Sequence, residues 1–315
     1  MKKILVTGGL GHIGSRLIRF MPEYFQEKLE IVLYDNLLTQ RYCSLFNLPQ
    51  TAIYRFVDGD IQTNNLEENF SGADLVVHLA AITQSTESIY QPGVVDKVNY
   101  EGTVRVANAC LELGIPIFFP SSTSVYGSLD SMVDEETEVT LMGAQTPYAE
   151  TKVAAEQYLH KLGGQGLRYT VIRFGTIFGI SPGIRFHTAV NKFTWQACVK
   201  KPITVWETAL NQRRPYLDIE DAVRAVSYII KNNIFDNQIY NLVTLNATVA
   251  DIIDEIKKHI NDVKISFVKN DAMNTLSYDV SCEKIKQLGY VCSGSLERGV
   301  RDTVDLFKNG LIMHE

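Results

Sequence analysis

Tyr148 and Lys152 stand four residues apart in a segment for which we predict a helix over Pro147–Leu162. This spacing places the phenol and the ammonium on one helix face, a turn apart. A free tyrosine titrates at about pH 10 and is a poor base at neutral pH. A neighbouring cation favours the phenolate, so Tyr148 is a candidate general base with Lys152 lowering its pKa. The same spacing also occurs in ordinary surface pairs, so the surrounding residues must decide.

Hydroxyl side chains follow a predicted strand over Ile115–Phe119, in the run Ser121-Ser122-Thr123-Ser124. The carboxyl ends of parallel strands open onto the crevice where α/β proteins bind ligands. A serine at that point can hydrogen-bond a substrate oxygen that gains or loses a proton. Combined with the phenol and the ammonium, it predicts interconversion of an alcohol and a ketone, with a hydride exchanged with a nicotinamide.

A glycine-rich segment, Thr7–Gly14, lies between the first predicted strand and the first predicted helix. In such a segment glycines permit a tight turn, a close approach of phosphate, and packing of helix on strand. The free N–H groups and the dipole of the helix N-terminus then favour a pyrophosphate. We expect the dinucleotide to contact Gly8, Gly11, His12, Ile13 and Gly14.

An acidic residue, Asp35, ends the second predicted strand about twenty residues beyond the glycines, a distance typical of dinucleotide sites. Its carboxylate can accept hydrogen bonds from ribose hydroxyls and would repel a 2′-phosphate, so NAD is favoured over NADP. His78 lies inside an apolar strand and is interpreted as a packed structural histidine. The other expected cofactor contacts at strand ends are Asn36, Asp60, Ile61, Leu79, Ala80 and Ala81.

Short β-branched runs alternate with longer helical patterns through the first two thirds of the chain. This alternation predicts an α/β fold with a Rossmann-type doubly wound parallel sheet and a smaller C-terminal α/β lobe. We expect a dinucleotide-binding domain over 1–178 with returning segments near 215–245, and a substrate lobe over 179–214 and 246–315. The predicted strands are Lys3–Val6, Glu30–Tyr34, Ile53–Val57, Asp74–Leu79, Ile115–Phe119, Tyr169–Phe174, Arg214–Ile219 and Gln238–Leu242. The predicted helices are His12–Met21, Val94–Leu113, Pro147–Leu162, Ala189–Val199, Glu220–Ile230, Val249–Ile260 and Leu296–Phe307.

Composition describes an ordinary globular protein of 315 residues with a formal net charge of -6. The absence of a basic stripe argues against nucleic acid as a partner. The five cysteines are odd in number and none pairs in Cys-x-x-Cys spacing, which argues against a disulfide or metal framework. No apolar run approaches a membrane span or a signal peptide, so we expect a cytoplasmic protein without a membrane partner.

In the order of these motifs the sequence resembles the extended short-chain dehydrogenase/reductases, in their NAD-dependent epimerase/dehydratase branch, along essentially the whole chain. That resemblance implies NAD as cofactor and a nucleotide-sugar as substrate. By position, Ser122 matches the catalytic hydroxyl residue, Tyr148 the base, and Lys152 the lysine that binds the nicotinamide ribose. Asn99 matches a cofactor-site asparagine, and Arg214 an arginine that holds the substrate diphosphate, although an interdomain salt bridge is the alternative for Arg214. The matching segments are Thr7–Gly14, Asp35-Asn36, Asp60-Ile61, His78–Ala81, 99–103, Ser121–Gly127, Tyr148–Lys152 and 214–218.

The sequence departs from the family pattern at its sugar-binding positions. Sugar 4,6-dehydratases carry an Asp-Glu pair where this chain has Thr123-Ser124, and hydroxyls cannot readily supply the acid and base that elimination needs. Related sugar-acid decarboxylases carry a glutamate in place of Ser124. Thr176 stands where many epimerases have an asparagine, and a second phosphate arginine is not evident in 270–277. Thr123 and Thr176 remain candidate substrate contacts.

The stretch Phe178–Asn191 resembles a subgroup that includes enzymes modifying nucleotide-activated heptoses. Arg185, His187 and Asn191 could contact the diphosphate or the sugar, or they could only brace the lobe.

The leading hypothesis from the sequence is an NAD-dependent nucleotide-sugar 4-epimerase. A net 4-dehydrogenase or 4-ketoreductase would use the same residues, and a 4,6-dehydratase fits less well. An NAD-bound regulator without activity is disfavoured because the whole hydroxyl–phenol–lysine set is present. The resemblance further implies a homodimer formed through the helices Val94–Leu113 and Pro147–Leu162, with Ala107, Ala109, Ala154 and Ala155 small enough for close packing.

Overall fold

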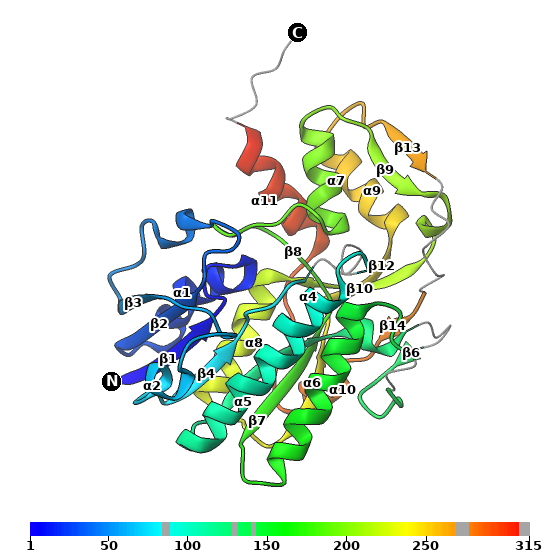
Figure 1. Cartoon of the computed structure of the whole chain (residues 1–315). Coiled ribbons are helices and arrows are strands. Elements are labelled where there is room, and N and C mark those ends of the chain that lie inside the picture. The colour runs from blue at the N-terminus through cyan, green and yellow to red at the C-terminus, as the bar shows by residue number, and fades with distance from the viewer. Residues whose placement is uncertain (84–88, 128–131, 140–142, 269–276, 309–315) are drawn as a thin grey trace.

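A seven-stranded parallel sheet forms the body of the protein in the computed structural model, which describes residues 1–83, 89–127, 132–139, 143–268 and 277–308 (Figure 1). The strand order is β11-β7-β5-β4-β1-β2-β3. The chain adds β2 and β3 on one side of β1 and then β4, β5, β7 and β11 on the other, so the order switches between β1 and β4. This is the doubly wound topology that the alternating pattern predicted. The strands are β1 (Lys2–Thr7), β2 (Leu29–Asp35), β3 (Ala52–Asp58), β4 (Leu75–His78), β5 (Ile117–Ser122), β7 (Tyr169–Phe174) and β11 (Gln238–Leu242).

Helices cover both faces of this sheet, because successive residues of each strand point to opposite sides. In β1, Ile4 and Val6 join the apolar core under one layer of helices, while Leu5 joins the core under the other. The first layer comprises α1 (His12–Phe25), α8 (Ile219–Lys231) and α10 (Glu283–Gln287). The second comprises α2 (Leu66–Phe70), α5 (Gly102–Leu113) and α6 (Pro147–Gly163).

A smaller lobe with its own apolar core stands above the carboxyl ends of the strands (Figure 1). Its position agrees with the predicted C-terminal lobe, while the assignment of cofactor and substrate to the two units stays a prediction. Its elements are α7 (Ala189–Cys198), β9 (Ile203–Trp206), α9 (Val249–His259), β13 (Ile265–Val268) and α11 (Leu296–Lys308). Three strands lie at the junction, β8 (Thr176–Phe178), β10 (Arg213–Asp218) and β12 (Leu245–Thr248), and a further pair is β6 (Met132–Val133) with β14 (Asp279–Val280).

Local capping residues fix the ends of the helices that matter for the site. Thr146 accepts a hydrogen bond from Ala149 N at 3.2 Å, and Pro147 follows it at the first helical position of α6. Thr248 forms a capping box with Asp251 at the start of α9. Among the described residues, no helix combines the length and apolarity required to cross a bilayer.

The helix predicted over Val94–Leu113 is present, and it contains a wide π-type turn that the sequence pattern did not indicate. The structure has α4 (Pro92–Asp96), a wide π-type turn η2 (Lys97–Glu101) and then α5. Within that turn the amide of Asn99 bonds the backbone of Ile82, and the hydroxyl of Thr103 bonds Asn99 O at 2.5 Å. The hydrogen bonds of Asn99 to Ile82 join this turn to the chain after β4, a contact that sequence periodicity alone cannot show.

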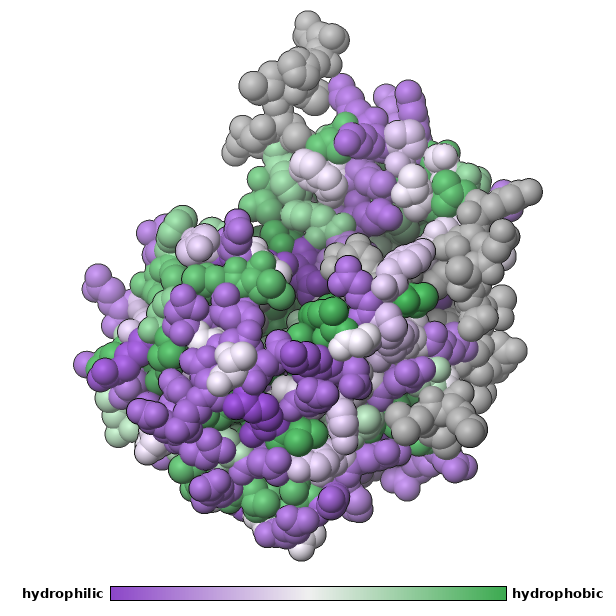
Figure 2. Space-filling model, viewed as in Figure 1, coloured by the Kyte–Doolittle hydropathy of each residue, from purple (hydrophilic) through white to green (hydrophobic). Residues whose placement is uncertain are grey.

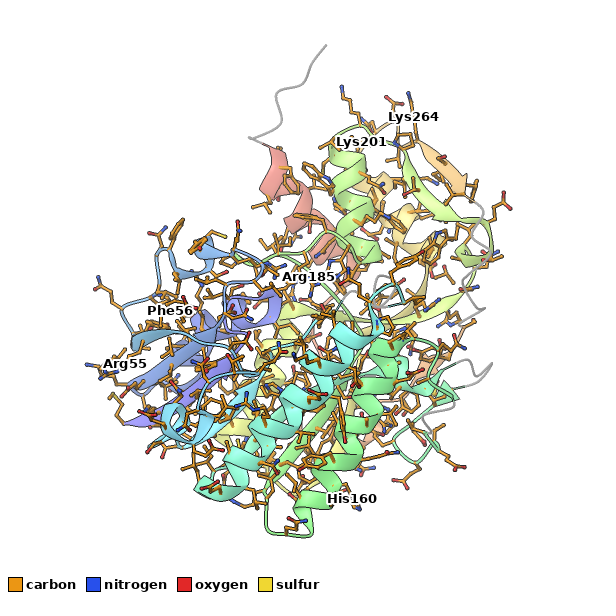
Figure 3. The ribbon with its side chains drawn as sticks, in the orientation of Figure 1. Arg55, Phe56, His160, Arg185, Lys201 and Lys264 are labelled. Carbon is orange, nitrogen blue, oxygen red and sulfur yellow. The ribbon has the colours of Figure 1, made fainter. Side chains whose placement is uncertain are left out.

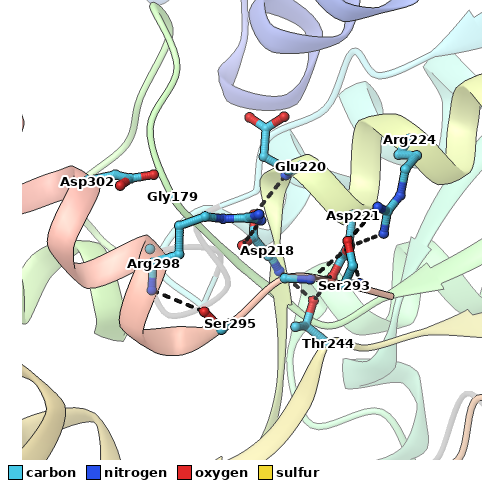
Figure 4. A network of polar contacts seen from close by, with 12 residues as sticks. Gly179, Asp218, Glu220, Asp221, Arg224, Thr244, Ser293, Ser295, Arg298 and Asp302 are labelled. Atoms are coloured by element: carbon cyan, nitrogen blue, oxygen red, sulfur yellow. Dashed lines mark hydrogen bonds and ion pairs between the residues drawn. The ribbon is translucent and has the colours of Figure 1, made fainter. Parts of the chain in front are cut away.

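A buried carboxylate network fastens the small lobe to the body (Figure 4). Asp221 is fully buried and accepts hydrogen bonds from Thr244 Oγ1 at 2.7 Å and from Ser293 N at 2.9 Å. Arg298, on α11, donates to the Asp218 carboxylate at 2.6 Å. The start of α8 therefore holds the chain segment that leads into α11.

Candidate active site

A large cavity of about 1090 Å³ lies between the carboxyl ends of the strands and the small lobe. In Figure 2 the surface is hollowed between the lower body and the upper lobe. A pocket for one small ligand is usually about 300–1000 Å³, so this cavity has room for two ligands at once. Every predicted site residue except Asn99 and Asn191 lines it: Gly8, Gly11, His12, Ile13, Gly14, Asp35, Asn36, Asp60, Ile61, Leu79, Ala80, Ala81, Ser122, Thr123, Tyr148, Lys152, Thr176, Arg185, His187 and Arg214.

The glycine segment forms one wall of the cavity in the way that its spacing predicted. Gly8 has φ +64°, and a Cβ there would lie 2.6 Å from Ala80 N. A Cβ on Gly14 would lie 2.6 Å from Gly9 O, so this glycine permits close packing of α1 on the strand. No side chain caps the α1 N-terminus at Gly11, and its first amide groups can donate to an anion.

Carboxylates occupy the cavity end near β2 and β3. Asp35 accepts hydrogen bonds from Leu10 N at 3.1 Å and Leu37 N at 3.0 Å. Burial raises the pKa of Asp35, and these two backbone hydrogen bonds oppose the rise. Asp60 accepts a hydrogen bond from Asn36 Nδ2 at 3.0 Å. Two fixed carboxylates at this end suit ribose hydroxyls and an exocyclic amine.

Tyr148 and Ser122 face each other across the opposite end of the cavity. Ser122, at the end of β5, accepts hydrogen bonds from Ser124 Oγ at 2.9 Å and Ser124 N at 3.2 Å, and its side chain bonds the Tyr148 hydroxyl. Burial raises the pKa of Tyr148, against the lowering influence of the Ser122 hydrogen bond and the Arg185 charge. The cation that lowers this pKa here is Arg185, and the expected influence of Lys152 stays a prediction.

Lys152 is buried behind the phenol, with 5 % of its surface exposed. Its Nζ donates to Pro120 O at 2.8 Å and lies 4.4 Å from the Phe119 ring centroid and 5.9 Å from the Tyr148 ring centroid. Burial lowers the pKa of Lys152 to about 8, while Glu156 raises it. The ammonium consequently gives up its proton at a lower pH than the phenol does.

Residues 179–187, here called the strap, run from the end of β8 across the N-terminus of α1. Gly183 N donates to Ser15 Oγ at 2.9 Å, and a Cβ on Gly183 would lie 2.5 Å from Leu10 O. His12 Nε2 bonds Gly179 O at 2.9 Å. Burial lowers the pKa of His12 to about 3, so the ring is neutral and bonds as a donor. The strap thus closes the cavity over the glycine wall.

Arg185 extends from the strap at the junction of the two units (Figure 3). Its guanidinium bonds the Thr83 hydroxyl, beyond the end of β4. His187 stands nearby with its pKa lowered to about 4 by partial burial and by the charges of Arg185 and Arg41. Asn191 instead braces the strap, since its amide bonds Gly179 N at 3.0 Å and Arg185 O at 3.1 Å and is fully buried.

The remaining predicted substrate residues differ in how available they are. Arg214 donates to Gln212 Oε1 at 3.3 Å and, within the described residues, has no ion pair with a carboxylate, so the salt-bridge alternative is not supported. The Thr123 hydroxyl is turned toward Phe174 O at 3.3 Å and is 3 % exposed. Thr176 lines the cavity at the start of β8.

Asn99 lies behind the cavity wall and not in it, which corrects the prediction of a direct cofactor contact. Its amide accepts from Ile82 N at 2.8 Å and donates to Ile82 O at 2.9 Å, fixing the chain after β4. His78 is structural, as predicted: it is 1 % exposed and bonds Thr7 Oγ1 at 2.7 Å and Thr103 Oγ1 at 3.0 Å.

Several cavity residues were missed at the sequence level. Arg41 lies near Asp35 and Gly11, and its place in the loop after Asp35 was an available signal. Ser121 Oγ is buried in the cavity wall without a hydrogen-bond partner in the described chain. The region searched for a second phosphate arginine, 270–277, falls outside the described residues except for Ser277. Others from the lobe and loops are Thr83, Gln145, Lys192, Trp206 and Gln212.

Known proteins share both the sequence pattern and the architecture. The model of the NAD dependent epimerase/dehydratase family matches residues 4–242. A trifunctional UDP-glucose 4,6-dehydratase/UDP-4-keto-6-deoxy-D-glucose 3,5-epimerase/UDP-4-keto-L-rhamnose-reductase of Arabidopsis thaliana is 30% identical over 97% of this chain, which spans about half (47%) of that protein.

Two solved structures have the same fold. An epimerase from Methanothermobacter thermautotrophicus superposes with a TM-score of 0.87 at 23% identity, covering 98% of this chain and 93% of the other. The UDP-glucuronic acid 4-epimerase of Bacillus cereus, solved with UDP-glucuronic acid and NAD, gives 0.86 at 24% identity, covering 98% and 100%.

Proposed function

Since the chain belongs to the NAD-dependent epimerase/dehydratase family, we propose that it is a nucleotide-sugar 4-epimerase acting through a transient 4-keto intermediate. The observation that carries the proposal is the Tyr148–Ser122 pair, hydrogen-bonded to each other on the wall of a cavity large enough for cofactor and substrate together. The family's cofactor is NAD.

The residues around the cavity fit this cofactor. Gly8 and Gly14 leave no room for a Cβ, and the uncapped α1 N-terminus offers amide groups to a diphosphate. Asp35 would hold the adenosine ribose, and the unpartnered Ser121 hydroxyl lies toward the nicotinamide end. When bound there, NAD supplies the hydride acceptor and donor that a 4-epimerase requires.

Tyr148 would take the proton from the sugar C4 hydroxyl and later return it. Ser122 would orient that hydroxyl, because it is already within hydrogen-bonding reach of the phenol. The Arg185 guanidinium lowers the cost of the phenolate. Closure of the cavity by the strap would exclude water from the ketone.

The nucleotide diphosphate would lie toward the small lobe. Arg214 is a guanidinium without a carboxylate partner among the described residues, and its forked donors suit a phosphate. Trp206 and Gln212 line the same part of the cavity and could hold the base. Arg185 and His187 stand between this region and the sugar.

Dehydration is not favoured, although several of the relatives are named for it. Elimination of water requires an acid and a base besides the tyrosine. Ser124 donates its hydroxyl to Ser122, and the Thr123 hydroxyl bonds a backbone carbonyl. Neither hydroxyl can serve as a carboxylate would.

A net 4-dehydrogenase or 4-ketoreductase is the second candidate, because it needs the same groups. The strap favours the epimerase: its bonds to Ser15 and His12 would slow the cofactor exchange that a net oxidoreductase must complete each turnover. A regulator without activity is the third reading, and the intact Ser122–Tyr148–Lys152 set speaks against it.

The test is turnover of UDP- and dTDP-sugars by purified protein, followed by chromatography of the products with no cofactor added. An epimerase converts substrate in many-fold excess over enzyme and stops at an equilibrium mixture. Dependence on stoichiometric external NAD or NADH would assign a net oxidoreductase instead. Loss of product formation in Tyr148→Phe, with NAD affinity retained, separates the enzyme from a regulator.

A further inference from the structure

Helix α6 carries a third ionisable residue on the face of Tyr148 and Lys152. Glu156 follows Lys152 by four residues, so the two side chains are neighbours on the helix surface. Both are buried, at 5 % and 6 % exposed, and neither is reached by bulk water. We propose that Glu156 is a positioning residue that keeps Lys152 protonated, and that Arg173 holds Glu156 in place for this task. This inference rests on the proposed function only for the role of Lys152 toward the cofactor.

Arg173 fixes the Glu156 carboxylate in two directions. From β7, Arg173 Nε donates to Oε1 at 3.1 Å and Nη2 to Oε2 at 2.7 Å. Arg173 Nη1 also donates to Tyr126 Oη at 3.0 Å, and that hydroxyl donates to Asn241 Oδ1 at 2.8 Å. These hydrogen bonds hold the Arg173 guanidinium on two sides. They thereby keep the Glu156 carboxylate in place, one turn of α6 beyond Lys152.

The surroundings of Lys152 leave Glu156 as the anion that acts on it. From β5 it meets the Pro120 carbonyl and the Phe119 ring. From β4, burial and the Lys152 charge lower the pKa of His78 to about 3, so this imidazole is neutral. The Tyr148 phenol carries no charge while it is protonated. Burial disfavours the ammonium, and the Glu156 carboxylate is the charge that opposes this effect.

The charge of Lys152 should therefore depend on Glu156. An ammonium binds a ribose hydroxyl more tightly than an amine does. NADH affinity should accordingly fall as the pH rises through the pKa of Lys152, which is about 8. Without the carboxylate, this fall should begin at lower pH.

The experiment measures NADH affinity by fluorescence from pH 6 to 10, which does not require turnover. Lys152→Met identifies the inflection that belongs to Lys152, since it should disappear in that variant. In Glu156→Gln the inflection should move down by about one pH unit, a tenfold loss of proton affinity. Glu156→Asp keeps the charge and should stay within a few tenths of a unit of the wild type.

A second variant separates this role from folding. Glu156→Gln leaves a buried arginine unpaired and lowers stability, whereas Glu156→Met with Arg173→Met removes both charges and should restore much of it. The inflection should be lowered in the double variant as well, by less than in Glu156→Gln, because the repulsion from the Arg173 charge is removed with the carboxylate. If it stays at the wild-type pH in both variants while only the melting temperature changes, Glu156 has a structural role alone and the proposal is wrong. A lowered inflection in a protein that turns over no sugar would uphold the inference and reject the proposed function.

Discussion

Gly183 lies with its Cα against the carbonyl of Leu10 and donates its N–H to Ser15 Oγ at 2.9 Å, so strap and glycine wall meet without room for a side chain. The contact joins a loop before the small lobe to the helix whose N-terminus would bind the diphosphate. Retention of the cofactor should thus depend on one position that carries no functional group.

Gly183→Ala should speed NAD dissociation by about tenfold, because a Cβ 2.5 Å from Leu10 O forces the strap outward. Stopped-flow displacement of bound NADH measures the rate. Gly93→Ala is the control, since a Cβ there meets nothing within 4 Å. An unchanged dissociation rate in Gly183→Ala would remove the strap from the argument for an epimerase.

Tyr148→Phe should lower the turnover rate by ~10²–10⁴-fold, the usual contribution of a general base. NAD affinity should change little, because the ring remains in place. Tyr158 is also on α6, and its hydroxyl bonds Asn108 of α5. The variant Tyr158→Phe loses this hydroxyl and should keep its rate. Product formation and NAD titration are measured on the same preparations. Equal rates in the two variants would exclude Tyr148 as the base.

Ser122→Ala should move the acid limb of the pH–rate profile to higher pH. The base must be ionised, so activity rises with pH through the pKa of Tyr148. Burial raises that pKa, and the Ser122 hydrogen bond opposes the rise. Without the Ser122 hydroxyl, less opposes the effect of burial, and the pKa of Tyr148 should rise further. The profile of kcat/KM against pH for both proteins gives the answer; a limb moved to lower pH would contradict the assigned role.

Acid should destabilise the protein through its buried histidines. Burial lowers the pKa of His12 and His78 to about 3, below the ordinary 6.5 of the unfolded chain. Between those values the unfolded state binds more protons, so stability is full above pH 6.5 and falls as the pH drops toward 3. Each histidine contributes at most about 1.4 kcal/mol per pH unit. Urea unfolding of His78→Gln at several pH values should show a shallower slope than wild type, whereas the exposed His160→Gln should not.

Dimerisation through the helical segment from α4 to α5 and through α6 remains a prediction with a specific test. Three of the four alanines named from the sequence, Ala107, Ala109 and Ala155, are fully buried within the monomer. Ala154 instead lines a groove between these helices, beside Tyr100 and Tyr158. Ala154→Arg should convert a dimer to a monomer in light-scattering measurements without loss of the far-UV spectrum. A monomeric wild type would end this prediction.

The parts of the site set by neighbouring residues could be foreseen from the sequence. The glycine segment, Asp35 and the Tyr148–Lys152 spacing each depend on one turn or one strand end, and the structure places all of them on the cavity. Contacts that join distant segments could not. Asn99 has the residue type of a cofactor ligand, yet its partner is Ile82.

The cations near Tyr148 likewise come both from a residue close to it in sequence and from a distant segment. Spacing identified Lys152 as the nearest cation along the helix, but Arg185 reaches Tyr148 through the course of the strap. The short strands β8, β9, β12 and β13 were likewise missed, because three or four residues carry too little periodicity to be recognised.

The order of the strands also bears on how the protein is made. Strand β7 ends at residue 174, while β11, which completes the sheet beside it, begins at residue 238. On the ribosome the edge of β7 therefore stays uncovered while the first part of the upper lobe is being synthesised. The sheet can therefore be completed only after α7 and β9 of the lobe have been synthesised.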